Sequence, residues 1–80
     1  MTGITMPALQ AFAETVAKVS TMADNCIKMH WKDNARVRVR NALAFYQVAM
    51  LTTDPMIRSV NFDAAKSELA AAAAILKMKV

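Results

Sequence analysis

Apolar residues recur at alternating steps of three and four through the first third of the chain. The residues of this repeat are Leu9, Phe12, Val16, Val19, Ala23, Cys26 and His30. A three-four spacing sustained over three heptads is typical of an α-helix that buries one face. The repeat therefore predicts one long helix over about 6–31, with Pro7 in its first turn, where the missing N–H has no partner to lose.

The second segment, about 35–52, is also predicted to be a helix. Asp33 and Asn34 favour caps and turns, so they are expected to separate it from the first helix. The stretch at 36–40 reads RVRVR, and its period of two also fits a strand. A lone strand would need a partner, and residues 42–51 are rich in helix-forming Ala, Leu, Met and Gln. Helix is therefore favoured, and the strand remains the alternative.

The third helix is predicted over about 62–78, after a short connection at 52–55. Its repeat consists of Phe62, Ala65, Leu69, Ala72 and Leu76. Asn61 or Asp63 is expected to cap it, while Asp54 and Pro55 begin a short turn whose Met56, Ile57 and Val60 pack on the core. The alanines at 70–74 let another helix approach closely. The three segments predict one all-α domain, 1–80, folded as an antiparallel helical hairpin or three-helix bundle.

Size and composition favour assembly of this domain with copies of itself. The chain has 80 residues and is 56% hydrophobic, so it has more apolar surface than a monomer of this size can bury. Its single cysteine allows no internal disulfide that would stabilise a monomer. The subunit interface is predicted to include Tyr46, Phe45, Leu69 and Leu76. The N-terminus lacks the pattern of a secretory signal, and the longest uncharged apolar run, 69–76, is too short to span a bilayer. A cytoplasmic protein without membrane contact is expected.

The stretch 28–40, KMHWKDNARVRVR, is the strongest candidate for a binding site. It holds five of the ten basic residues, together with the only Trp and the only His. Helix N–H groups and guanidinium forks both suit phosphate, which predicts an anionic, phosphate-bearing ligand such as nucleic acid or a nucleotide. The proposed ligand-binding residues are Arg36, Arg38, Arg40, Lys28 and Lys32, with Trp31 as a stacking face for a base.

A purely structural interpretation of the same stretch stays open. In it, the arginines form a solvated turn and pair with Asp33, Glu14, Asp24 or a neighbouring subunit. In a helix Arg36 and Arg40 share a face and Arg38 points away, so at most two of the three serve one ligand.

Catalytic and metal chemistry find little support in the sequence. Cys26 and His30 are one helical turn apart, but no second cysteine or histidine completes a metal shell. The six carboxylates are scattered singly, and no glycine-rich phosphate loop or Ser–His–Asp set occurs. No enzymatic activity, metal or cofactor is therefore expected.

The alternative function is a protein-interaction module, an inhibitor or adaptor that docks an apolar helix face on a partner. Seven methionines are compatible with an adaptable surface of this kind, although methionine at helical spacing more often fills a core. In size, charge and helicity the chain resembles small accessory proteins encoded by phages, some of which are helical oligomers that block host factors or sequester nucleotides. Steep salt dependence of binding would favour the phosphate-bearing ligand, and weak dependence the protein partner.

Overall fold

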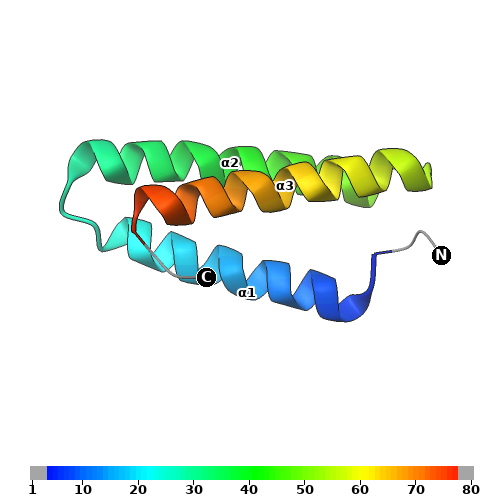
Figure 1. The fold of residues 1–80 in the computed structure, drawn as a ribbon, viewed down its shortest axis with the longest axis horizontal. Helices are drawn as coiled ribbons and strands as arrows, with labels where there is room; N and C mark the ends of the chain where they lie inside the picture. The colour runs from blue at the N-terminus through cyan, green and yellow to red at the C-terminus, as the bar shows by residue number, and fades with distance from the viewer. Residues whose placement is uncertain (1–3, 78–80) are drawn as a thin grey trace.

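A computed structural model describes residues 4–77 of the protein and shows three α-helices. The helices are α1 (Met6–Asp24), α2 (Met29–Leu51) and α3 (Pro55–Ile75). α2 and α3 run antiparallel side by side, and α1 lies along one face of this hairpin (Figure 1). The bundle is elongated, with principal extents of 42, 20 and 15 Å. The predicted all-α three-helix bundle is confirmed, and residues 36–40 are helical.

Side-chain caps fix the first residues of α1 and α3. The Thr5 hydroxyl accepts a hydrogen bond from the Ala8 N–H at 3.2 Å, and Pro7 follows in the first turn. The Asp54 carboxylate accepts from the N–H groups of Met56 and Ile57 at 2.9 and 3.3 Å. Both contacts satisfy N–H groups that the helix itself leaves free.

The prediction that the third helix begins near 62 is wrong, because α3 begins at Pro55. Asp54 caps the whole helix, and the following residues contain no breaker that would end its first turn. Asn61 lies inside the helix, where its side chain donates to the Ile57 carbonyl at 2.8 Å. The predicted end at 78 lies outside the described residues, and α3 ends at Ile75.

The break between α1 and α2 also differs from the prediction. α1 ends at Asp24 rather than near 31, and α2 begins at Met29 rather than at 35. The N–H groups of Asn25 and Cys26 bond to the carbonyls of Thr21 and Ala23 at 3.1 and 3.2 Å, which closes the last turn of α1. Asp33 and Asn34 lie inside α2, where their side chains face solvent and therefore lose little by being helical.

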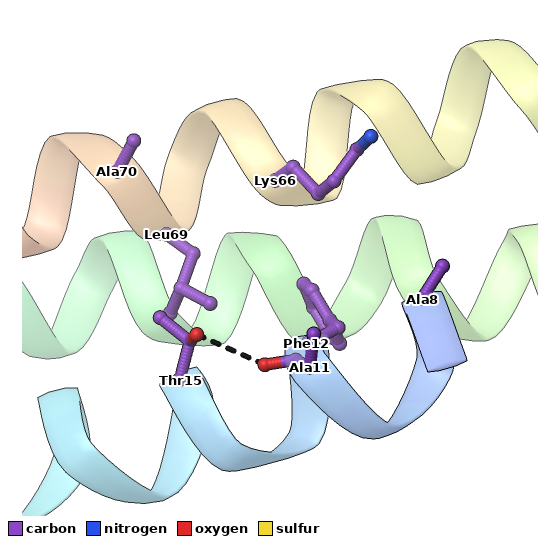
Figure 2. A pocket seen from close by; sticks show the side chains of 7 residues that line it. All are labelled: Ala8, Ala11, Phe12, Thr15, Lys66, Leu69 and Ala70. Carbon is purple, nitrogen blue, oxygen red and sulfur yellow. Dashed lines mark hydrogen bonds between the residues drawn. The ribbon is translucent and has the colours of Figure 1, made fainter. Parts of the chain in front are cut away.

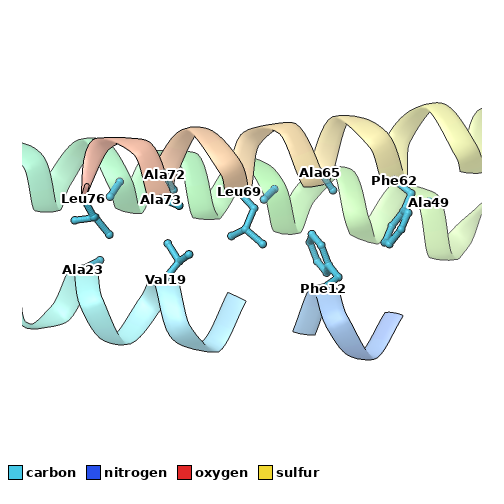
Figure 3. Close-up of a cluster of buried hydrophobic side chains, with 12 residues drawn as sticks. Phe12, Val19, Ala23, Ala49, Phe62, Ala65, Leu69, Ala72, Ala73 and Leu76 are labelled. Carbon is cyan, nitrogen blue, oxygen red and sulfur yellow. The ribbon is translucent and has the colours of Figure 1, made fainter. Parts of the chain in front are cut away.

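Two different interfaces hold the three helices together. α2 packs on α3 through alanines at intervals of seven residues: Ala35, Ala42 and Ala49 on α2, with Ala65 and Ala72 on α3, all 0% exposed. Side chains this small allow two backbones to approach closely. α1 instead packs through large side chains, and Phe12 and Val19 point across toward α3 (Figure 3).

The aromatic centre of the core joins all three helices. The Phe12 ring stacks on Tyr46 of α2 with centroids 5.0 Å apart, and lies 5.5 Å from the ring of Phe62 on α3. Leu69 and Leu76 extend the core toward the far end of α3 (Figure 3). Within residues 4–77 no charged or polar residue is buried, so this core is held by apolar packing alone.

Candidate functional site

The basic end of the bundle is formed by Lys28, Trp31, Lys32 and Lys77. It lies where the α1–α2 link meets the C-terminal end of α3 (Figure 1). The Lys28 Nζ lies 4.1 Å from the centroid of the Trp31 ring, and the Lys77 Nζ lies 5.8 Å from it. Both distances are within cation–π range. The half-buried indole thus gathers two ammonium groups that are 49 residues apart in sequence (77 − 28).

The backbone brings these lysines to the same place. Lys28 is the N-cap of α2. Lys77 follows the C-cap of α3 with a φ of 59°, and its N–H bonds to the Ala74 carbonyl at 3.1 Å. This left-handed residue ends the helix in the manner of a C-terminal capping turn. The start of one helix and the end of another therefore share one corner.

The N-terminus of α2 differs from those of α1 and α3 in having no side-chain cap, whereas Thr5 and Asp54 cap the other two helices. Like them, it has no acidic residue in its first turn. The free N–H groups of a first turn carry partial positive charge and favour an anion. Lys28 and Lys77 lie beside this helix end, and the ion pairs seen among residues 4–77 include neither of them.

The three arginines do not join this cluster. The Arg36 Nη2 lies 2.9 Å from the Asp24 Oδ1 of α1, and the Arg38 Nη1 lies 3.0 Å from the Glu68 Oε2 of α3. Arg40 is exposed, and the structure shows it in no ion pair with a described residue. The pairing of Arg36 with Asp24 was one of the contacts of the structural interpretation, and it ties α2 to α1.

Glu68 is the centre of a polar network between α2 and α3. Its side chain is 19% exposed, accepts from Asn41 Nδ2 at 3.0 Å, and accepts from Arg38 Nη1 at both oxygens. The Asn41 hydrogen bond, followed by the hydrogen bond and charge of Arg38, lowers the pKa of Glu68, although partial desolvation acts in the opposite direction. Sequence reasoning missed this residue, because nothing local links positions 38 and 68.

The stacking role predicted for Trp31 meets an obstacle in the structure. Lys28 already lies over the ring, and the indole is half-buried.

Cys26 and His30 do not lie on one helix, contrary to the expectation of a single helix over 6–31, because Cys26 lies in the α1–α2 link while His30 is exposed on α2. The Cys26 thiol contacts the Lys28 carbonyl at 3.6 Å. No group of three metal-ligating side chains occurs among residues 4–77, and none of their helices is long and apolar enough to cross a membrane.

A second surface lies at the opposite end of the hairpin, around the α2–α3 turn. Six large apolar side chains are exposed there, and we call them the turn patch: Phe45, Val48, Leu51, Met56, Ile57 and Val60. Met56, Ile57 and Val60 were expected to pack on the core, but they are 75%, 46% and 62% exposed. The early start of α3 explains this, because it turns these residues outward on a regular helix.

The residues predicted for a subunit interface have different positions. Leu69 and Leu76 are only 3% and 9% exposed and belong to the core of a single chain. Tyr46 is half-buried against Phe12. Phe45 alone lies on the surface, at 38% exposure, as part of the turn patch.

An apolar groove of about 420 Å³ runs between α1 and α3, with Phe12 and Leu69 at its floor (Figure 2). Lys66 lies at its rim and is engaged with its own helix, 3.3 Å from Asp63 and 5.1 Å from the Phe62 ring. The Thr15 hydroxyl donates to the Ala11 carbonyl at 2.9 Å (Figure 2). The groove thus lacks the free, converging polar groups that orient a small ligand.

Comparisons with known proteins leave the site to be interpreted from its own geometry. No family model, curated protein or solved structure matches this chain. The two surfaces at opposite ends of the bundle are therefore the basis for assigning a function.

Proposed function

We propose that this protein is a non-enzymatic binder of an anionic, phosphate-bearing ligand, either nucleic acid or a nucleotide, and that the ligand binds at the basic end. The observation that carries the proposal is the convergence of Lys28 and Lys77 on Trp31, beside the uncapped N-terminus of α2. Phosphate oxygens accept hydrogen bonds from both kinds of donor. A net charge of +4 adds attraction at longer range.

Each residue of the basic end has a role in this proposal. Lys28 and Lys77 supply the direct charge, and the first-turn N–H groups of α2 orient the phosphate. In the free protein Trp31 holds the two ammonium groups near its ring. When the ligand binds, Lys28 moves to the phosphate and leaves that face of the indole to a base. Lys32, one turn further along α2, is half-buried and extends the positive surface.

The arginines contribute differently from what the sequence alone suggested. Arg36 and Arg38 are 56% and 47% exposed at the side chain but hold carboxylates of the same chain. Arg40 projects into solvent on the same face as Arg36. In the proposal these three residues strengthen the field of the basic end, and Lys28 and Lys77 make the contacts.

Trp31 provides the test, because it is the only tryptophan and lies inside the proposed site. Its fluorescence is titrated with a mixed-sequence single-stranded oligonucleotide and with a nucleoside triphosphate, at low and at raised salt. We expect Lys28→Gln with Lys77→Gln to weaken binding about tenfold or more, and salt to weaken binding of the wild type steeply.

The matched control is Lys18→Gln with Lys66→Gln, which removes the same charge from α1 and α3 away from the basic end. This variant should retain affinity within about threefold, because it alters only the long-range field. Equal weakening by the two double variants would mean that binding depends on the total charge of the protein and not on the basic end. Absence of binding by the wild type at low salt would refute the proposal.

A second candidate function is that of a protein-interaction module, and the turn patch favours it. Surfaces of this kind are rare on small monomers, which normally hide contiguous apolar side chains. Association through the turn patch would depend weakly on salt, in contrast to phosphate binding. The identity of the partner at this surface is a separate question.

A further inference from the structure

We propose that the turn patch binds a second copy of this chain, in a two-fold contact that places one patch against the other. The contact does not depend on ligand binding at the basic end. It follows from the position of the patch, its charge and the amount of surface that a single chain exposes.

Val48 and Val60, one from each helix of the turn patch, lie on the face of the hairpin that α1 does not cover. Val48 is two residues from Tyr46, and Val60 is two residues from Phe62. Both aromatic side chains contact Phe12 of α1, Tyr46 in a stacked arrangement at a centroid distance of 5.0 Å and Phe62 in a tilted one at 5.5 Å. Two residues along a helix turn the side chain through roughly 200°, so Val48 and Val60 point away from α1.

The patch side chains follow one another along each helix close to the turn. Leu51 follows Val48 by three residues and Val60 follows Ile57 by three, so each pair lies side by side on its helix. Across the turn, the Arg58 Nη2 donates to the Thr52 carbonyl at 2.8 Å. Because the patch residues lie on regular helices, association would require little ordering of the backbone.

Charge singles out a second copy as the occupant. Between residues 42 and 60 the only charged side chains are Asp54 and Arg58, so this segment is neutral and the whole net charge of +4 lies elsewhere. A charged partner would find no complementary charge here. Two copies of a basic chain repel through their basic ends, and the α2–α3 turn lies at the end of the bundle opposite the α1–α2 link (Figure 1).

A single chain exposes more surface than its mass alone predicts. The chain exposes 5409 Å², whereas a compact monomer of 8.8 kDa is expected to expose about 4,800 Å². The elongated shape, 42 by 20 by 15 Å, contributes to this excess, and so do the exposed side chains of the turn patch. A standard interface would bury roughly 800 Å² on each partner. An isologous contact uses the same patch on both chains, so every contact between two patch residues occurs twice.

In this arrangement both basic ends stay outside the contact, because the turn patch lies near the opposite end of each bundle. A long polyanion would then meet two binding sites on one particle, which raises its affinity above that of a mononucleotide. This consequence rests on the proposed function, whereas the pairing of chains does not.

Sedimentation velocity of the full chain over a range of concentrations tests the pairing. We expect a species of twice 8.8 kDa that dissociates on dilution. Leu51→Glu with Val60→Glu should weaken the dimer roughly a hundredfold or more, because four carboxylates would meet in an apolar contact. Circular dichroism should stay unchanged, because both side chains are mostly exposed, at 76% and 62%.

Ile27→Glu with Met22→Glu is the matched control, because these apolar side chains are also exposed, at 92% and 47%, but lie outside the patch. This variant should dimerise like the wild type. Leu51→Lys with Val60→Lys should be monomeric alone and should pair with Leu51→Glu with Val60→Glu.

Three results would overturn the proposal. They are a wild-type chain that stays monomeric at every concentration, a dimer that survives Leu51→Glu with Val60→Glu, and one that the control variant disrupts equally. A monomeric double-Glu variant that binds the nucleoside triphosphate as the wild type does would leave the basic end intact. Failure of the pairing and failure of the proposed function are thus distinguishable.

Discussion

The α2–α3 seam and the α1 interface solve the same packing problem in opposite ways. In the seam, Ala35, Ala42 and Ala49 lie against an alanine-rich face of α3 and are 0% exposed. At the α1 interface, Phe12 and Val19 reach across a wider separation and leave a groove of about 420 Å³ beside Phe12 (Figures 2 and 3). The seam depends on small size, whereas the α1 interface depends on buried apolar area.

This difference assigns separate tasks to the two parts of the molecule. The basic end, with Lys28, Trp31 and Lys77, lies where α2 begins and α3 ends. The turn patch is made of exposed residues of both helices near the turn that joins them. The hairpin thus carries both candidate surfaces and sets the distance between them. α1 supplies Asp24 to Arg36 but otherwise acts as the cover of one apolar face.

Loss of the Phe12 ring should produce the largest effect, because it removes the main attachment of α1. Phe12→Ala deletes a ring that is 5% exposed and that contacts Tyr46 and Phe62. The expected loss is about 3–5 kcal/mol in the free energy of unfolding, measured by urea denaturation.

Met22→Ala is the matched control on the same helix, because Met22 is 47% exposed. It should change the free energy of unfolding by no more than about 0.5 kcal/mol. If the two variants were equally stable, α1 would contribute much less than its contacts imply.

The alanine seam should respond to added volume rather than to lost volume. Ala42→Leu inserts three carbons where the two backbones meet, and it should lower the free energy of unfolding by about 1–3 kcal/mol. Ala44→Leu adds the same atoms two residues away, on the exposed side of α2, and should be nearly neutral. Thermal unfolding at one low protein concentration compares the two. If Ala42→Leu were as stable as the wild type, the α2–α3 seam would be less tightly packed than the burial of its alanines indicates.

The periodic part of this fold was predictable because it depends on local spacing. Phe12, Val19 and Ala23 were placed on one buried face by their three-four steps, and the structure confirms that burial. The break between α1 and α2 was not predictable in the same way. Residues 24–25 and 33–34 are both Asp–Asn, so the local signal is identical at the two positions. Tertiary packing determines which of the two Asp–Asn pairs ends a helix, because a helix that starts at Met29 buries Ala35 at 0% exposure.

The candidate site was predictable only where neighbours in sequence are neighbours in space. Lys28 lies three residues from Trp31, and its place at the basic end follows from that spacing. The approach of Lys77 depends on where α3 ends, which the sequence placed at 78. The turn patch was missed because apolar residues in a sequence do not show whether they are buried within the same chain or left exposed.

The smallest expected effect concerns Glu68, whose network crosses the seam beside the alanines. Because the hydrogen bond from Asn41 and the contacts of Arg38 lower its folded pKa, the stability that they contribute is present above the unfolded pKa. It is lost as the pH falls through the folded pKa. Carboxyl NMR titration should give Glu68 a lower pKa in the wild type than in Asn41→Ala, since this substitution removes the largest cause of the shift. Correspondingly, Glu68→Gln should be less stable than the wild type at neutral pH, and the difference should shrink at acidic pH. An identical pKa in the wild type and Asn41→Ala would show that the Asn41 hydrogen bond does not stabilise the ionised Glu68 carboxylate.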